Sequence, residues 1–234
     1  MMKTLRYLTL IFLMGGLWTA CKKGDPAPAG LTALNVINAS TDVPSVAVNF
    51  TIPPTPFYKQ QAVVGYGSVA EYGNLPGSLP LTLVSSADTT QNLFQGTLNI
   101  GKGKIFSLYI CGTLPRVDTL LMQDNIPVHR DSTSGLRIIN LSPDSGPLSV
   151  NIAGASATDF TPLAYKQISA FKSYPVTSAI INNGGYNFEV KDGSGNVVAT
   201  FSWNNSFFPF KNYTMVISGL ASQSSVQVFQ VNNF

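Results

Sequence analysis

"NVINASTDVPSVAVNF", residues 35–50, returns later in the chain as "RIINLSPDSGPLSVNI", residues 137–152. Each stretch reads as the end of one strand, a polar turn and the start of a second strand. In the first stretch Val46, Val48 and Phe50 alternate with small or polar residues, which places alternate side chains on opposite faces of a strand. The pattern predicts the same strand–turn–strand unit twice.

The likeness between the two parts of the chain extends beyond this unit. Residues 34–50 and 136–152 align without a gap and share seven of seventeen residues. YGSVAEY at 66–72 then matches YKQISAF at 165–171, and residues 77–112 align ungapped on 184–219. Three collinear matches indicate a tandem repeat.

Composition favours strands over helices throughout the repeats. The chain is only 11% charged and is rich in β-branched, aromatic and turn-forming residues. YNFEVKDGSGNVVATFSW, residues 186–203, reads as a hairpin with a Gly-rich turn. We therefore expect an all-β fold of two tandem immunoglobulin-like β-sandwiches, the first at 32–127 and the second at 135–234, joined by a linker at 128–134.

The N-terminus has the layout of a secretory signal peptide. Lys3 and Arg6 precede an apolar run, and small residues lead to Cys21. The junction resembles the lipobox of bacterial lipoproteins, which implies a signal peptide at 1–20 and a lipid on Cys21 with a flexible tether over 21–31. Acyl chains are worth about 0.8 kcal/mol per buried methylene, so they would hold the protein on a membrane. We expect a lipid-anchored protein of the cell envelope, at the outer membrane, on either its periplasmic or its surface-exposed side.

Charge and cysteine content exclude other classes. The formal net charge is +3; without residues 1–20, 12 Lys and Arg stand against 11 Asp and Glu, which gives no electrostatic case for nucleic acid. With Cys21 lipidated, Cys111 has no partner for a disulfide, so stability must come from the cores.

The order of these blocks is similar to that of a known family. A first strand ending in N-x-S-x-D, then Y-x-x-V-x-x-Y at 66–72, a Gly before an alternating strand, and a later strand ending in a small residue and Gly resemble the domain of unknown function 4397 family. The resemblance implies a β fold and a place in the bacterial envelope, often as tandem copies in lipoproteins. That family has no established activity.

Catalytic and metal-binding chemistry finds little support. His129 is the only histidine and lies in the predicted linker as a solvated residue, where a general base would not be held in position. DGSGN at 192–196 begins like a calcium loop, but Trp203 stands where the bidentate acid belongs, so we expect a plain hairpin turn. We predict no enzyme activity, no catalytic residue, no cofactor and no metal.

Four polar residues recur in the two copies. We interpret Asn38, Asp42, Asn140 and Asp144 as turn residues whose side chains bond backbone N–H groups. The alternative is a ligand or calcium site at each Asp, which needs more oxygen ligands than the turn offers.

The copies differ most at residues 201–211, where FSWNNSFFPFK replaces a glycine-containing stretch of the first copy. Trp203, Phe207 and Phe208 are the candidate binding patch, for a glycan or a protein, and the alternative is that they fill the interior. The sequence thus favours a non-enzymatic envelope lipoprotein acting as a surface binding or adhesion module. A structural accessory subunit of an envelope complex is the alternative, and an undetected hydrolase is a remote one.

Overall fold

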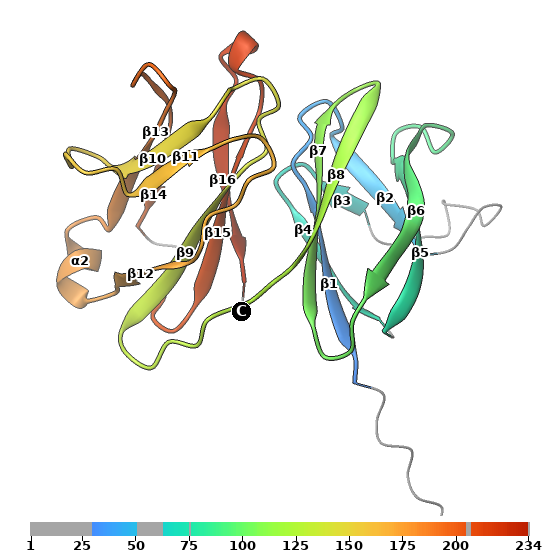
Figure 1. The fold of residues 1–234 in the computed structure, drawn as a ribbon, viewed down its shortest axis with the longest axis horizontal. Coiled ribbons are helices and arrows are strands. Elements are labelled where there is room, and N and C mark those ends of the chain that lie inside the picture. Colours follow the sequence, from blue (N-terminus) through green and yellow to red (C-terminus); the bar gives the residue numbers. More distant parts are fainter. Residues whose placement is uncertain (1–29, 51–62, 75, 205–206, 234) are drawn as a thin grey trace, which may run out of the picture. The chain divides into compact units, whose positions relative to one another are not determined.

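The computed structural model describes residues 30–50, 63–74, 76–204 and 207–233, and Leu31–Phe234 form one compact unit (Figure 1). The predicted all-β fold is confirmed, with four four-stranded sheets. The first eight strands are β1 (Thr32–Asn38), β2 (Ser45–Asn49), β3 (Val63–Gly65), β4 (Val69–Asn74), β5 (Gly77–Ser85), β6 (Asn92–Ile100), β7 (Ile105–Thr113) and β8 (Arg116–Gln123). The remaining elements are β9 (Thr133–Asn140), β10 (Leu148–Ile152), β11 (Phe160–Leu163), β12 (Lys172–Pro175), α2 (Ser178–Asn182), β13 (Tyr186–Lys191), β14 (Val197–Trp203), β15 (Asn212–Ser218), η3 (Ala221–Gln223) and β16 (Gln227–Asn232).

The strands form two β-sandwiches with the same strand order. In the first sandwich, sheet β4-β1-β7-β8 packs on sheet β3-β2-β5-β6. In the second, β12-β9-β15-β16 packs on β11-β10-β13-β14. In each sandwich the first strand pairs in parallel with the seventh, β1 with β7 and β9 with β15. The hairpin expected at 186–203 is present as β13 and β14.

Each sandwich has its own apolar core, built by alternation along the strands. Leu34 and Val36 of β1 point into the first core, together with Leu108 of β7. Leu136 and Ile138 of β9 occupy the same places in the second. Because successive side chains of a strand point to opposite faces, the residues between them must lie on the far side of the same sheet.

Those intervening residues form a third apolar cluster, shared by the two sandwiches. We call β4-β1-β7-β8 and β12-β9-β15-β16 the inner sheets. Their facing sides bury Ile37, Tyr109 and Cys111 from the first sandwich against Ile139 and Val216 from the second. The two sandwiches are therefore joined by a buried interface as well as by the chain between β8 and β9.

Candidate functional site

The recurring asparagines fix the polar turn that follows the first strand of each sandwich. Asn38 Nδ2 donates to the carbonyl of Val43 at 2.8 Å, and its Oδ1 accepts from the Ser40 N–H at 3.1 Å. Asn140 repeats the second bond, since its Oδ1 accepts from the Ser142 N–H at 3.0 Å. Both asparagines are fully buried, and their amides supply the partners that the buried turn backbone needs.

The aspartates of the same motif bond a different loop. Asp42 Oδ2 accepts from the Leu114 N–H at 3.2 Å, 72 residues away. Asp144 accepts from the N–H groups of Ala221 and Ser222 at 2.7 and 3.1 Å, at the start of η3. These carboxylates therefore tie the first strand's turn to the loop after the seventh strand, rather than fixing their own turn.

The candidate aromatic patch needs correction. Trp203 and Phe207 are 0% and 2% exposed, and only Phe208 lies at the surface. Trp203 packs at 4.5 Å between ring centroids on Phe207 and at 5.4 Å on Tyr213, inside the second core. The aromatics fill the interior because Trp203 takes an inward position of the alternating strand β14. The three side chains do not form a common binding surface.

The two cysteines differ in what can be said of them. Cys21, the predicted lipidation site, lies outside the described residues. Cys111 is fully buried between the inner sheets, and the Tyr165 hydroxyl lies 3.3 Å from its Sγ. Burial raises the pKa of the Cys111 thiol to about 11. This thiol is a small core side chain and is protonated at neutral pH.

His129 is held in place rather than solvated as expected. Its Nδ1 and Nε2 hydrogen-bond Thr133 Oγ1 at 3.0 Å and Asn212 Oδ1 at 2.9 Å. Gly135 permits this approach, because a Cβ there would lie 2.0 Å from Asn212 Oδ1. The ring joins the segment before β9 to the start of β15, which is a structural role.

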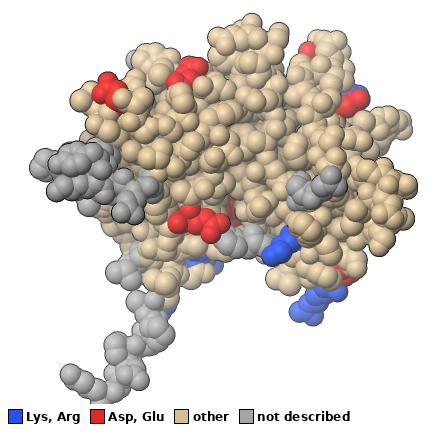
Figure 2. Space-filling view, turned by 180° about the vertical axis from the view of Figure 1, so that it is seen from behind, with Lys and Arg blue, Asp and Glu red and all other residues tan. Residues whose placement is uncertain are grey.

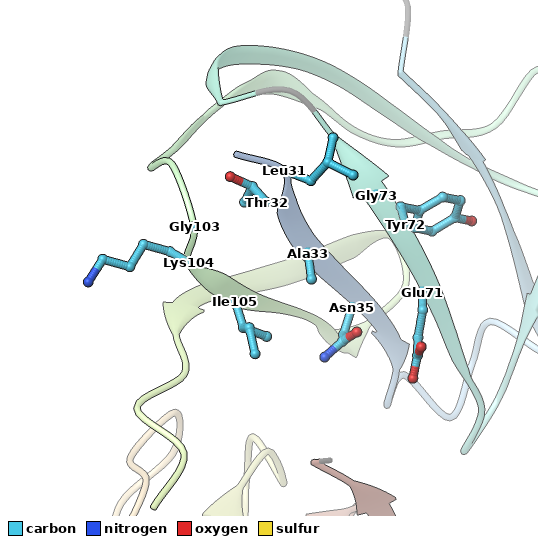
Figure 3. Close-up of a pocket in the computed structure, with 10 residues that line it drawn as sticks. All are labelled: Leu31, Thr32, Ala33, Asn35, Glu71, Tyr72, Gly73, Gly103, Lys104 and Ile105. Atoms are coloured by element: carbon cyan, nitrogen blue, oxygen red, sulfur yellow. The ribbon is translucent and has the colours of Figure 1, made fainter. Parts of the chain in front are cut away.

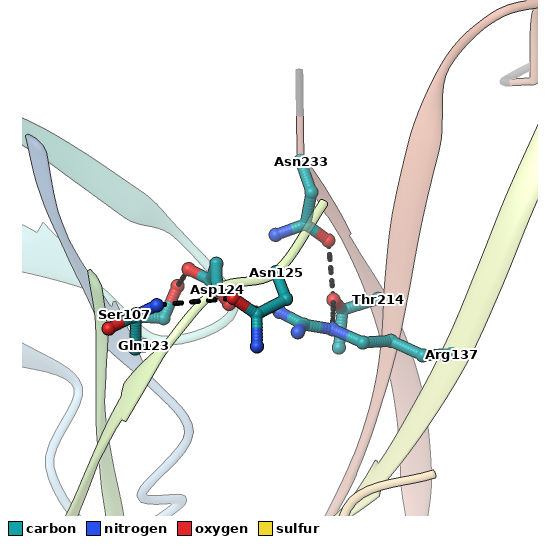
Figure 4. Close-up of polar contacts among 7 residues, drawn as sticks. All are labelled: Ser107, Gln123, Asp124, Asn125, Arg137, Thr214 and Asn233. Atoms are coloured by element: carbon teal, nitrogen blue, oxygen red, sulfur yellow. Dashed lines mark hydrogen bonds and ion pairs between the residues drawn. The ribbon is translucent and has the colours of Figure 1, made fainter. Parts of the chain in front are cut away.

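A buried polar network crosses the interface between the inner sheets (Figure 4). Arg137 Nη2 of the second sandwich donates to Asp124 Oδ1 at 2.5 Å, and these side chains are 4% and 0% exposed. Asp124 Oδ2 accepts from Ser107 Oγ at 2.6 Å, and Arg137 Nε donates to Thr214 Oγ1 at 2.8 Å. Thr214 in turn donates to Asn233. Each charge is thus paired and hydrogen-bonded, as a buried ion pair must be.

Contacts across this interface are reciprocal. Tyr66 of the first sandwich bonds Ser218 of the second, with 2.6 Å between their oxygens. Tyr165 of the second bonds Cys111 of the first. Tyr66 and Tyr165 hold corresponding positions in the two aligned copies, as do Cys111 and Ser218. When residue i contacts j and the counterpart of j contacts the counterpart of i, the surfaces are related by an approximate two-fold axis.

The polar network breaks this symmetry at one position. Asn35 of β1 pairs with Ser107 of β7 just as Arg137 of β9 pairs with Thr214 of β15, so Asn35 is the counterpart of Arg137. Arg137 has its carboxylate partner, whereas Asn35 Oδ1 has no hydrogen-bond partner among the described residues, although Asn35 is 2% exposed. A buried, unpaired acceptor costs about 1–3 kcal/mol, and Asn35 Oδ1 is one of the buried side-chain atoms of the described residues that carry this cost.

Asn35 lines a hollow of about 490 Å³ on the inner sheet of the first sandwich (Figure 3). Glu71 of β4 stands directly beside Asn35 in the strand register, and both side chains point to the same side of the sheet as Ala33 and Ile105. Lys104 lies at the rim with an exposed side chain. We call this hollow the sheet hollow. Its floor is apolar, and two hydrogen-bond acceptors and one cation line it.

The residues that the structure describes show neither of two further features. They contain no group of three His, Cys, Asp or Glu side chains placed to hold a metal ion. Within the same residues, no helix is long and apolar enough to cross a bilayer.

Sequence reasoning did not single out Asn35, Glu71 or Lys104. One signal was present, because the alignment of 34–50 with 136–152 sets Asn35 against Arg137, a change in charge at a buried, inward-facing place. The neighbours that make the hollow lie on β4 and β7, and only the folded register brings them to Asn35.

The model of a domain family of unknown function, DUF4397, matches residues 32–151, which span the first sandwich, β9 and nearly all of β10. No curated protein matches the chain. Similar solved structures include the C-terminal domain of AlgF from P. aeruginosa, with 15% identity, 41% of this chain and 98% of that chain covered, and a TM-score of 0.28. A family 41 carbohydrate-binding module structure from streptococcal virulence factors has 11% identity, 85% and 96% coverage, and a TM-score of 0.25. A structure titled for alpha-glucan binding by a streptococcal virulence factor has 9% identity, 85% and 97% coverage, and a TM-score of 0.25.

Proposed function

We propose that this chain, which belongs to the DUF4397 family, is a non-enzymatic binding or adhesion protein of the bacterial cell envelope, and that its ligand occupies the sheet hollow. The observation that carries the proposal is Asn35 Oδ1, an acceptor that is buried, unpartnered among the described residues and on the wall of the hollow. A ligand that donates a hydrogen bond there removes the cost of an unpaired buried acceptor.

The lining of the sheet hollow defines the class of ligand. Asn35 Oδ1 and the Glu71 carboxylate accept hydrogen bonds, whereas the Lys104 ammonium only donates them. A hydroxyl group both donates and accepts, so neighbouring hydroxyls can satisfy both kinds of partner. Ala33 and Ile105 offer the apolar floor on which the C–H face of a sugar ring can lie. These features favour a glycan.

We place the protein on the envelope through a lipid on Cys21. The signal-like residues 1–20 and the lipobox-like junction support this placement at the outer membrane. Cys21→Ser removes the acceptor of the lipid, and the variant should leave the membrane fraction after a high-salt wash. Unchanged fractionation of Cys21→Ser would refute the anchor without bearing on the sheet hollow.

We also propose that the two sandwiches are tandem copies of one immunoglobulin-like domain. Their identical strand order and their reciprocal contacts, Tyr66 with Ser218 and Tyr165 with Cys111, support a duplicated unit. Divergence at Asn35 and Arg137 then separates the roles of the copies. One position holds the interface together, and its counterpart lines the sheet hollow.

Glycan binding is tested with the mature chain carrying Cys21→Ser, first on an array of bacterial glycans and then by titration calorimetry with the best ligand. Glu71→Gln and Asn35→Leu should each weaken binding about tenfold or more, since the first replaces one carboxylate oxygen and the charge and the second removes the amide acceptor, each change worth on the order of 1.5 kcal/mol. Asp88→Asn, an exposed carboxylate change on the β5–β6 loop, is the matched control and should bind as the parent does. Equal affinity of all three variants would contradict a site in the sheet hollow.

A second candidate, a structural accessory subunit, is favoured by the shared cluster between the inner sheets. Two sandwiches joined through a buried core make a stiff spacer, whereas two domains on a bare linker do not. A pull-down from detergent-solubilised membranes should then return a stoichiometric partner. Recovery of the chain alone would count against this candidate.

A further inference from the structure

Four of the seven large hydrophobic residues that are exposed in the described part of the chain lie at one end of the molecule. They are Leu31, Val128, Phe208 and Phe210, exposed by 65, 84, 61 and 53%. Single exposed apolar residues are ordinary, but a group of them marks a contact surface.

Backbone contacts establish that these residues share one end. The Gly103 N–H donates to the Leu31 carbonyl at 3.2 Å, which joins the start of β1 to the β6–β7 turn. The Asn212 side chain donates to the Pro127 carbonyl at 2.8 Å, next to Val128. The Phe210 N–H donates to the Thr133 carbonyl at 2.8 Å. Because β1, β7, β9 and β15 all begin here, the parallel pairs bring the four segments together.

Positive charge gathers at the same end. Lys102 and Lys104 lie in the β6–β7 turn, Arg130 lies between β8 and β9, and Lys211 precedes β15. All four side chains are exposed, and none forms an ion pair with another described residue. One acid, Asp131, lies among them and accepts a hydrogen bond from Thr133.

Four cations away from this end are neutralised by partners. Lys166, Lys172, Lys191 and Arg137 are each paired with an Asp or Glu. In Figure 2 the blue Lys and Arg side chains gather along the lower edge, and most of the red Asp and Glu lie higher. The exposed apolar group therefore lies beside four cations that form no ion pair with another described residue.

We infer that this end, which we call the basal surface, docks on the surface of an anionic phospholipid bilayer. The basal surface consists of Leu31, Val128, Phe208 and Phe210 with Lys102, Lys104, Arg130 and Lys211. Exposed lysines and arginines attract anionic headgroups, and apolar side chains among them insert at the headgroup boundary. Two signals together hold a protein at a membrane far better than one.

The position of the tether supports this occupant, and here the inference rests on the proposed lipid anchor. Gly30 follows Cys21 by nine residues, which reach about 30 Å when fully extended. The chain enters the first sandwich at Leu31, within the basal surface. A lipid on Cys21 would therefore keep this end within reach of the bilayer.

The test uses the mature chain with Cys21→Ser, so that no acyl chain contributes, and vesicles of phosphatidylglycerol with phosphatidylcholine. The chain should sediment with anionic vesicles, lose this binding as salt rises, and bind pure phosphatidylcholine weakly. Lys102→Gln with Lys211→Gln should weaken binding about 25-fold, since each lysine near an anionic bilayer is worth roughly fivefold. Phe208→Ser with Phe210→Asn should also weaken it, and Asn accepts the positive φ of 66° at residue 210.

The matched control is Lys166→Gln with Lys191→Gln, which removes the same charge from paired lysines outside the basal surface. It should bind anionic vesicles as the parent does. The inference is overturned if the two lysine pairs have equal effects, if neutral vesicles bind as well as anionic ones, or if neither binds. Lys102 and Lys211 do not line the sheet hollow, so this failure would leave glycan binding intact, and loss of glycan binding would leave the vesicle result intact.

Discussion

The interface between the inner sheets is asymmetric at the level of single residues, because it holds an ion pair at one place and no charges at the corresponding place. Arg137 and Asp124 neutralise each other in a buried setting, while the counterpart of Arg137 is the neutral Asn35. Asn233, two residues beyond the β16 partner of Thr214, also has an unpartnered Nδ2 among the described residues. One ion pair therefore fixes the interface, and its symmetry mate is a pair of asparagines.

Removing one member of the ion pair should be costly. Arg137→Met leaves the Asp124 carboxylate buried with only Ser107 as a bonded partner, and we expect a loss of about 3–5 kcal/mol in the free energy of unfolding. Arg137→Met with Asp124→Leu should recover most of that loss, because no charge is left buried. Urea denaturation measures both. A cost below about 1 kcal/mol for the single variant would contradict the paired, desolvated state.

Cys111 offers a chemical test of the interface. Burial holds the pKa of its thiol at about 11, and the thiolate is the reactive form. In the Cys21→Ser chain at pH 8, a thiol reagent should leave Cys111 unmodified in the native protein and modify it fully in denaturant. Because the folded pKa lies above the unfolded one, this group's contribution to stability is complete below about pH 9 and falls as pH rises through 11. Fast native modification would show that the inner sheets part readily.

The repeated N-x-S-x-D motif, which we call the clasp, joins two segments that lie far apart in the sequence. Its Asn holds the turn after the first strand, and its Ser hydroxyl bonds the carbonyl of a glycine 72 or 77 residues away, Gly112 or Gly219. These glycines have φ of 77° and 93°, which other residues rarely adopt. The motif thus needs a glycine near the end of the seventh strand.

The two clasps should differ in strength. Asp144 accepts hydrogen bonds from Ala221 and Ser222, whereas Asp42 accepts one from Leu114. Asp144→Ala should cost about 1 kcal/mol, as loss of a helix cap does, and Asp42→Ala less. Equal costs in urea denaturation would argue against the difference in bonding.

Acid should weaken the Asp144 clasp selectively. Burial acts to raise the pKa of Asp144, but the bonds from Ser222 and Ala221 outweigh it and hold the pKa below its usual value. A depressed folded pKa contributes stability above the unfolded pKa of 3.8, and this is lost as pH falls through the folded pKa. The difference between parent and Asp144→Ala should therefore vanish in strong acid and persist at pH 6.

Local sequence patterns made the strands and turns predictable. The long-range register between strands could not be predicted from them. The alternation in 46–50 and the turn chemistry of Asn38 depend on neighbours in sequence. The sequence pattern allowed Trp203 either a surface or an interior place, and the register of β14 decides for the interior. The hydrogen-bond partners of Asp42 and Asp144 lie on another loop, and no local sequence pattern predicts them.

For the whole molecule, the shared cluster between the inner sheets is the decisive feature. Ile37, Ile139 and Val216 are fully buried only because the sandwiches meet. The two-copy pattern alone predicted two sandwiches and a linker, but the buried face between them follows from apolar residues such as Ile37 of β1 and Ile139 of β9. The sequence shows these apolar residues, but the residues that pack against them lie in the other sandwich and no local pattern identifies them. The same limit hid the sheet hollow.

A joined core predicts cooperative unfolding. Calorimetry of the mature Cys21→Ser chain should show one transition whose calorimetric and van't Hoff enthalpies agree, because neither sandwich can unfold without exposing the shared cluster. Ile139→Asp places an unpaired charge in that cluster and should split the transition in two. Two separate transitions in the parent would mean that the interface adds little to stability.

The most direct test of the central claim is an NMR titration of isotope-labelled mature chain, carrying Cys21→Ser, with the glycan that binds best on the array. We expect the shifts to cluster at residues 31–35, 71–73 and 103–105, with the Asn35 side-chain amide among the largest, and Glu71→Gln to reduce them strongly at the same ligand concentration. Shifts centred on β13 and β14, or no saturable shifts with any envelope glycan, would contradict it.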